Sequence, residues 1–177
     1  MACADLIIDE ANGIALDVLS MTGEGENTSY LVVDFDATGG DSYAFGYSWD
    51  DSSSVLDMLT AISSSTELVA LTTNYGEFGT FLDNFLFGDE AGDPQNYWAH
   101  SLATPDGLGE VDWIAASGGV DVTMLTDGGI SGWYNGFTED YDVIPPSLPT
   151  IVVPAPALAP MAMLLLAITP RGRKRTR

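Results

Sequence analysis

The first 170 residues contain no lysine and no arginine, although they hold all 26 Asp and Glu residues of this 177-residue chain. This part therefore has a formal charge of −26, and five basic residues among the last seven bring the net charge to −21. A protein body without cations cannot release counterions from a phosphate backbone, which excludes nucleic-acid binding. Phosphoryl transfer is disfavoured for the same reason, because its sites rely on cationic clamps.

Cysteine and histidine are nearly absent as well. Cys3 is the only cysteine and His100 the only histidine, so neither an internal disulfide nor a usual nitrogen–sulfur metal cluster is expected. His100 would have to serve any Ser-His-Asp site, and no G-x-S-x-G motif accompanies it. We therefore expect no catalytic residue, no metal and no cofactor. A carboxylate pair of the glycosidase type is the remaining enzymatic alternative, because the acids are numerous.

The start of the chain contains a small-residue pattern. Ala2 and Ala4 form the Ala-x-Ala motif that remains where a signal peptidase cuts, although no basic or apolar region precedes it. We interpret residues 1–11 as a signal-peptide remnant and N-terminal segment, with the mature chain beginning near Asp5. The end of a lipobox at Cys3 and an ordinary N-terminus are the alternatives.

The opposite end combines three features. Val153, Pro154, Ala155 and Pro156 come first, an uncharged apolar run to Ile168 follows, and a basic cluster ends the chain. A helix over 151–168 would span about 27 Å, which is short for a hydrocarbon core of about 30 Å. The prolines shorten the regular helix further. The basic cluster consists of Arg171, Arg173, Lys174, Arg175 and Arg177.

Basic residues behind an apolar segment stay on the cytoplasmic side, which places the acidic body outside. The three parts over 153–177 resemble a PEP-CTERM sorting signal. This resemblance implies that a membrane transpeptidase, an exosortase, cleaves near Pro154–Pro156. The protein would then contact the inner membrane transiently before reaching the cell surface or extracellular matrix of a Gram-negative bacterium. Ala155 stands where the family usually has Glu, and a plain single-pass tail anchor is the alternative.

Between the two ends we expect one acidic globular domain over 12–141, followed by a proline-rich linker over 142–152. Residues 29–35 alternate as a strand with Leu31, Val33 and Phe35 on one face. After a turn, the strand 43–49 alternates four aromatic residues with small ones. The face of this strand that carries the small residues permits close packing, and the helix that follows in the sequence is available to pack against this face.

That helix is predicted from the apolar spacing of Val55, Leu56, Leu59 and Ile62, with Ser52–Ser54 as its N-cap region. The aromatic, glycine-broken segment 75–82 follows a predicted strand at 68–73. Further strands are predicted at 96–102, 111–115, 120–126 and 130–134. The expected fold class is α+β, mostly antiparallel sheet with one principal helix.

The order of these elements resembles the transcobalamin-C-terminal-like β-grasp domain over residues 14–137. The resemblance is carried by the hairpin, the helix start at 54–59, Tyr75–Gly79, the pair Tyr97 and Trp98, and the segment 125–133. It implies a domain that binds a ligand or a partner. It does not imply cobalamin, because no cobalamin contact can be transferred to this chain.

Two further patterns concern binding. Tyr97, Trp98, Trp133 and Tyr134 can offer flat rings to a sugar, although aromatic side chains at strand spacing are also typical of a core. The segment that begins Asp34-x-Asp36 imitates the start of a calcium-binding EF-hand loop, but Phe45 stands in place of the bidentate Glu. A hairpin turn explains this segment better.

The sequence therefore predicts an exported, exosortase-processed surface or matrix protein with a non-enzymatic acidic domain. The alternative is a domain that binds a small ligand or glycan at the cell surface, and the third hypothesis is a secreted glycosidase. Because the carboxylates are crowded and lack basic partners, we also expect neighbouring charges to raise their pKa values. Stability should then increase on mild acidification.

Overall fold

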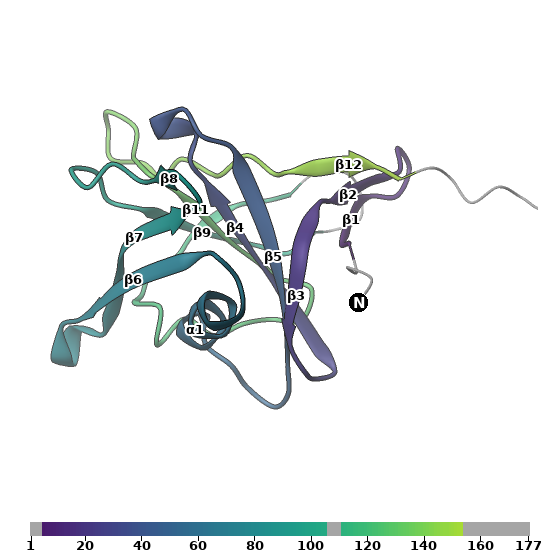
Figure 1. Cartoon of the computed structure of the whole chain (residues 1–177), viewed down its shortest axis with the longest axis horizontal. Helices are drawn as coiled ribbons and strands as arrows, with labels where there is room; N and C mark the ends of the chain where they lie inside the picture. Colours follow the sequence, from purple (N-terminus) through teal and green to yellow (C-terminus); the bar gives the residue numbers. More distant parts are fainter. Residues whose placement is uncertain (1–4, 106–110, 154–177) are drawn as a thin grey trace, which may run out of the picture.

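The computed structural model describes residues 5–105 and 111–153, which form layers around a central six-stranded sheet (Figure 1). In spatial order its strands are β10 (Ile114–Ala115), β9 (Ala99–Ala103), β11 (Ile130–Tyr134), β4 (Asn27–Asp34), β5 (Ser42–Trp49) and β3 (Val18–Gly23). Neighbouring strands pair antiparallel, except that β4 is parallel to β11 and β3 is parallel to β5.

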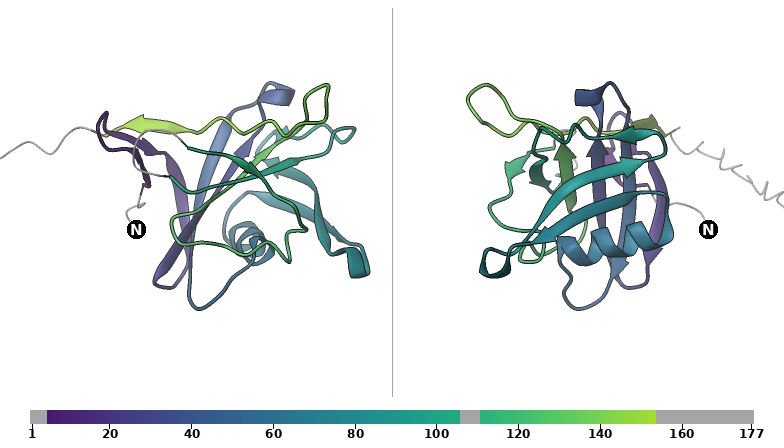
Figure 2. Two further views of the ribbon diagram at one scale, coloured as in Figure 1. Left: turned by 180° about the vertical axis from the view of Figure 1, so that it is seen from behind. Right: turned by 60° about the vertical axis from the view of Figure 1, so that its left-hand side comes forward.

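A second layer covers one face of this sheet (Figure 2). It contains the helix α1 (Val55–Ser65) and a three-stranded antiparallel sheet. The strands of this sheet are β6 (Val69–Asn74), β7 (Thr80–Phe87) and β8 (Glu90–Ala91), and a short 3-10 turn, η2 (Gly76–Phe78), joins the first two. The predicted α+β class, with mostly antiparallel pairing and one α-helix in the described residues, is confirmed.

The hairpin of β4 and β5 forms the centre of the molecule. Leu31, Val33 and Phe35 are fully buried on the face that α1 covers, as their alternation predicts. Tyr43, Phe45 and Tyr47 of β5 lie on this same face, so the helix packs on the aromatic side of the strand and not on its small side. The large rings supply more apolar area to bury against a helix, which explains this difference from the expectation.

The small side of β5 lies against the other core. Ala44 is fully buried among Leu16, Val18 and Val32. The missing side chain of Gly46 leaves the space that the Met21 side chain of β3 occupies. Small residues therefore do permit a close neighbour here, but the neighbour is a strand.

The helix begins where the serine-rich segment predicts. Ser54 has extended backbone angles, and its hydroxyl accepts a hydrogen bond from the Asp57 N–H at 3.2 Å. In return, the Asp57 carboxylate accepts the Ser54 N–H at 2.8 Å. These reciprocal bonds form a capping box, which satisfies donors that a helix start otherwise leaves unpaired.

The predicted strand at 120–126 is wrong. Apart from one isolated bridge at Met124, this segment is a turn whose carbonyl groups serve the helix start. The oxygen of Val120 accepts the Leu56 N–H at 2.8 Å, and that of Thr123 accepts the Val55 N–H at 2.9 Å. The alternation of apolar and polar residues over 120–126 is typical of a strand. In the structure, however, the backbone carbonyl groups of this segment accept hydrogen bonds from N–H groups in the first turn of α1, which have no partner within the helix.

The proline-rich segment packs onto the domain. The carboxylate of buried Asp34 accepts the Ser147 N–H at 2.7 Å, and Pro149 O accepts the Asp17 N–H at 2.7 Å. β12 (Thr150–Val152) then pairs antiparallel with β2 (Ile14–Leu16), which also pairs with β1 (Ile7–Asp9). The folded part thus includes β1 and extends to Val153, beyond the boundaries expected at residues 12 and 141.

Among residues 5–105 and 111–153, no helix has the length and apolar character needed to cross a membrane. Val153 is the last described residue, and its N–H donates to Gly13 O at 2.6 Å. The remaining predicted sorting residues, Pro154 to Pro156 and the basic cluster, lie outside the described residues, as do Ala2 and Cys3.

Candidate functional site

A groove of about 1170 Å³ lies among the described residues. Three segments far apart in the sequence line it: the β6–β7 turn, the segment before β9, and residues 116–122. Trp98, directly before β9, and His100 and Trp133 of the central sheet line it as well, and all three are buried. The groove is therefore lined both by exposed loops and by buried polar and aromatic side chains of the domain.

The four predicted aromatic residues are not arranged as one platform. Trp98 and Trp133 both pack edge-to-face against Phe85, with ring centroids 5.0 and 5.8 Å apart, and belong to the core. Tyr97 is 83% exposed and lines the groove. Tyr134 is only partly buried and does not line the groove; burial, followed by the charges of Asp36 and Asp34, raises its pKa.

Instead, the groove presents aromatic residues that the platform hypothesis missed. Phe78 of η2 is 79% exposed, and Phe81 at the start of β7 is also exposed. Tyr75 stands edge-to-face to Phe81, with ring centroids 6.1 Å apart. The aromatic, glycine-broken composition of 75–82 was the available signal, since aromatic residues within a tight turn have little core to enter.

His100 lies at the groove in an unusual setting. Its ring is stacked on Trp133, with centroids 4.0 Å apart and planes 4° from parallel. Its Nε2 is 2.9 Å from the Ser131 hydroxyl, which also accepts the Trp133 Nε1–H at 3.2 Å. Its Nδ1 is buried and has no hydrogen-bond partner among the described residues. Burial lowers the pKa of His100 to about 3, so the ring is neutral at physiological pH.

The contact between Ser131 and His100 does not form an activated nucleophile. A catalytic serine needs a base with a pKa near the working pH and a third group that orients the base. Here the pKa is about 3, and no carboxylate contacts Nδ1. Ser131 itself is buried, and its oxygen is occupied by the Trp133 donor.

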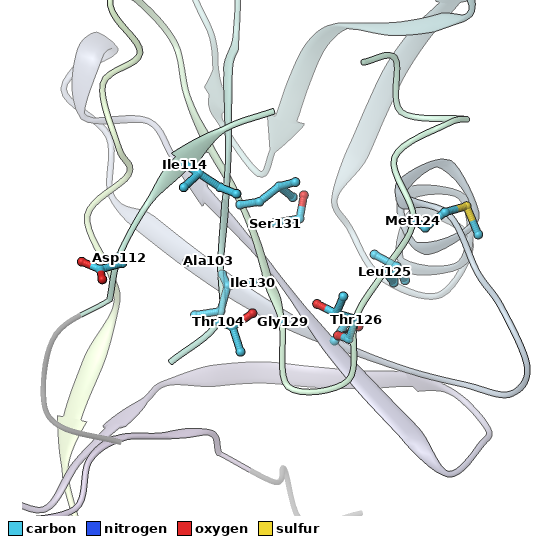
Figure 3. Close-up of a pocket in the computed structure, with 12 residues that line it drawn as sticks. Ala103, Thr104, Asp112, Ile114, Met124, Leu125, Thr126, Gly129, Ile130 and Ser131 are labelled. Carbon is cyan, nitrogen blue, oxygen red and sulfur yellow. Dashed lines mark hydrogen bonds between the residues drawn. The ribbon is translucent and has the colours of Figure 1, made fainter. Parts of the chain in front are cut away.

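A second, smaller pocket is lined by Ser131 and by neighbouring residues of the central sheet (Figure 3). Its volume is about 210 Å³, and its walls come from β9, β10, β11 and the segment 124–129. Ile114 and Met124 border it with exposed apolar side chains, and Asp112 is its single carboxylate. Its size suits only a very small ligand, since most ligand pockets exceed about 300 Å³.

The described residues contain no group of three or more metal-ligating side chains. In the segment that resembles the start of a calcium loop, Asp36–Thr38 form a 3-10 turn, η1, and Gly39 adopts φ 79°. The Asp34 carboxylate accepts the Asp36 N–H at 2.9 Å within this turn. The hairpin-turn interpretation of this segment is confirmed.

Hydrogen bonding, and not crowding, dominates the clear shifts among the carboxyl groups. The pKa of Asp9 is lowered by bonds from Asn12, and that of Asp57 by bonds from Ser54. The pKa of Asp121 is lowered mainly by the Thr80 N–H, which it accepts at 2.9 Å. These directions are opposite to the increase expected from neighbouring charges. A carboxylate that gains backbone donors is stabilised in its ionised form.

No family model matches this chain, and no curated protein or solved structure matches it.

Proposed function

We propose that this chain is an exported, non-enzymatic protein of the cell surface or extracellular matrix, which an exosortase releases from an inner-membrane intermediate. The observation that carries the proposal is the order of Val153–Pro156, an apolar run and a basic cluster. The position of β12 supports it, because this strand pairs with β2 immediately before Val153. A processing signal directly after the last strand leaves the domain intact when the tail is removed.

We further propose that the domain is a β-grasp domain. Its support is the path of the chain: the β4–β5 hairpin leads into α1, and β11 later lies beside β4 in parallel. β9 flanks β11 on the far side. A hairpin, a helix across one face and a late strand inserted parallel to the first strand are the elements of the β-grasp arrangement.

The non-enzymatic part of the proposal is supported by the state of His100. The only histidine of the chain is buried and neutral, and no carboxylate among residues 5–105 and 111–153 hydrogen-bonds to its Nδ1. The hydrolytic alternative has to rely on a pair of acids. It predicts turnover of a polysaccharide that disappears when one Asp or Glu is replaced.

The processing proposal is tested by expressing the full chain behind a complete, cleavable signal peptide in a Gram-negative host with and without an active exosortase. Intact-mass measurement should show loss of the residues after 154–156 only in the host with the enzyme. The double variant Pro154→Ala, Pro156→Ala should retain its tail. The matched control Pro145→Ala, Pro146→Ala changes two upstream prolines and should be processed normally. Mature protein that still carries Arg177 in the exosortase-containing host would refute the proposal.

A second candidate function is the binding of a small ligand or glycan at the surface. It is favoured by the exposed aromatic residues of the groove, Tyr97 and Phe78. It is compatible with export and independent of how the tail is removed.

A further inference from the structure

The groove combines exposed rings from separate segments. Phe78 comes from the β6–β7 turn and Tyr97 from the segment before β9, and both side chains are about four-fifths exposed. Tyr75 and Phe81 extend the aromatic surface beside Phe78. Exposed aromatic side chains gathered at one hollow mark a binding surface more often than a random surface position.

Two buried rings form part of the wall of the same groove. His100 and Trp133 line it, and their rings are stacked with centroids 4.0 Å apart. The His100 Nε2 and the Trp133 Nε1 both lie within hydrogen-bond distance of the Ser131 hydroxyl. This part of the wall is therefore flat and aromatic, and its ring nitrogens are held by the sheet.

The charge of the groove limits the ligand. Glu77, Asp83 and Asp121 line it, and the described residues include no lysine or arginine to offset them. An anionic ligand would be repelled. Gln95 and Asn96 add amide groups, which both donate and accept hydrogen bonds. Carboxylates, amides and flat rings together suit a ligand that is rich in hydroxyl groups and uncharged.

We infer that the groove binds a neutral oligosaccharide, whose sugar rings stack on Tyr97 and Phe78 while its hydroxyl groups bond to the carboxylates and amides that line the groove. This inference deepens the candidate binding function and rests on it, but it does not depend on exosortase processing. Sugars offer apolar ring faces to aromatic side chains and hydroxyl groups to carboxylates and amides. The volume of about 1170 Å³ accommodates several sugar units.

The test uses the purified full-length chain and hexasaccharides of defined charge. Binding of cellohexaose, mannohexaose and maltohexaose is measured by calorimetry and by tryptophan fluorescence, since Trp98 and Trp133 line the groove. At least one neutral hexasaccharide should bind with saturation, whereas the hexamer of galacturonic acid should not. Hexalysine is the second comparison, because an acidic aromatic groove can also attract a cationic peptide.

Variants locate the site. Tyr97→Ser and Phe78→Ser should each weaken binding about tenfold, since each removes one stacking surface. Both residues are exposed, so the fold should be unaffected. Tyr141→Ser is the matched control, because Tyr141 is 87% exposed and does not line the groove.

Three results would overturn the inference. The first is that none of the three neutral hexasaccharides binds at millimolar concentration. The second is that hexalysine binds and loses affinity in Tyr97→Ser while the neutral sugars do not bind, which would assign the groove to a cationic peptide. The third is that Tyr141→Ser weakens sugar binding as much as Tyr97→Ser. The processing experiment above is unaffected by any of these results.

Discussion

At the scale of single residues, His100 shows how burial decides chemistry. Burial keeps this side chain, which any Ser-His-Asp site of the chain would have to use, neutral by lowering its pKa to about 3. Stacking on Trp133 and the bond to Ser131 fix the ring without supplying a counter-charge. The structure therefore uses the only histidine of the chain as a flat polar ring at the edge of the core.

This state makes stability dependent on pH. The pKa of His100 is about 3 in the folded protein, against an ordinary value of 6.5. Between these values the unfolded chain binds the proton and the folded protein does not, so the free energy of unfolding falls as the pH is lowered below about 6.5. At pH 5 the expected loss is about 2 kcal/mol. Urea unfolding at pH 7.5 and pH 5 in 0.15 M NaCl measures it.

The variant His100→Phe is the control for this prediction, because it removes the titrating group and keeps an aromatic ring. Its free energy of unfolding should change much less between the two pH values. The lowered pKa values of Asp9, Asp57 and Asp121 affect stability only at lower pH, below their ordinary value of 3.8. Equal losses in both proteins would show that groups other than His100 control this range.

At the scale of elements, the hairpin and the helix follow directly from the sequence. The alternation of Leu31, Val33 and Phe35 and the apolar spacing from Val55 predict elements that the structure contains. The sequence also located β6 and β11 closely. Each of these segments buries one face, and a periodic pattern of apolar residues in the sequence indicates such a buried face.

Other elements have no periodic pattern that the sequence could show. β1, β2 and β12 have three residues each, too few for a period to emerge. The predicted strand at 111–115 is reduced to Ile114 and Ala115. The groove could not be assembled from sequence either, because its rings come from segments whose proximity depends on the loops around β7 and β9. Of the four aromatic residues for which a core position was the alternative to the platform, Trp98 and Trp133 belong to the core.

The capping box of α1 gives a prediction at this scale. Ser54→Ala removes the hydroxyl that accepts the Asp57 N–H, and it should lower the free energy of unfolding by about 1 kcal/mol. Ser64→Ala, an exposed substitution in the last turn of the same helix, should cause no comparable loss. Chemical denaturation of both variants distinguishes a specific cap from a general effect of replacing serine.

A second prediction concerns the attachment of the proline-rich segment. The Asp34 carboxylate accepts N–H groups from both Asp36 and Ser147, so Asp34→Ala should loosen the hairpin turn and release the segment that leads to β12. Faster proteolysis and faster amide exchange around 147–152 should follow. Asp41→Ala, at an exposed position of the same hairpin, is the control. Unchanged exchange in Asp34→Ala would mean that the pairing with β2 and the bonds of Pro149 and Val153 hold this segment without the Asp34 carboxylate.

At the scale of the whole molecule, electrostatic repulsion is the dominant feature. The first 170 residues have 26 carboxylates and no lysine or arginine, and the carboxylates of the described part rely on backbone and side-chain donors. Self-repulsion of this size destabilises a compact state, and dissolved salt screens it. The domain is therefore expected to be most stable at high ionic strength.

We predict that raising NaCl from 0.02 to 0.5 M at pH 7.5 increases the Tm by several degrees. Screening depends on ionic strength and not on the identity of the cation, so tetramethylammonium chloride should have nearly the same effect. Thermal unfolding followed by circular dichroism makes the comparison. A rise with Na⁺ alone would indicate a specific ion site, and the absence of any rise would show that repulsion between the carboxylates is unimportant.

The place of the β1–β2–β12 sheet has a consequence for orientation. This sheet lies at one end of the molecule, whereas the β6–β7 turn lies at the other (Figure 1). A domain held to an envelope through the residues after β12 would keep Phe78 on its outermost tip, facing the medium. The distance between the envelope and Phe78 would then be set by the length of the domain itself, and no additional stalk would be needed.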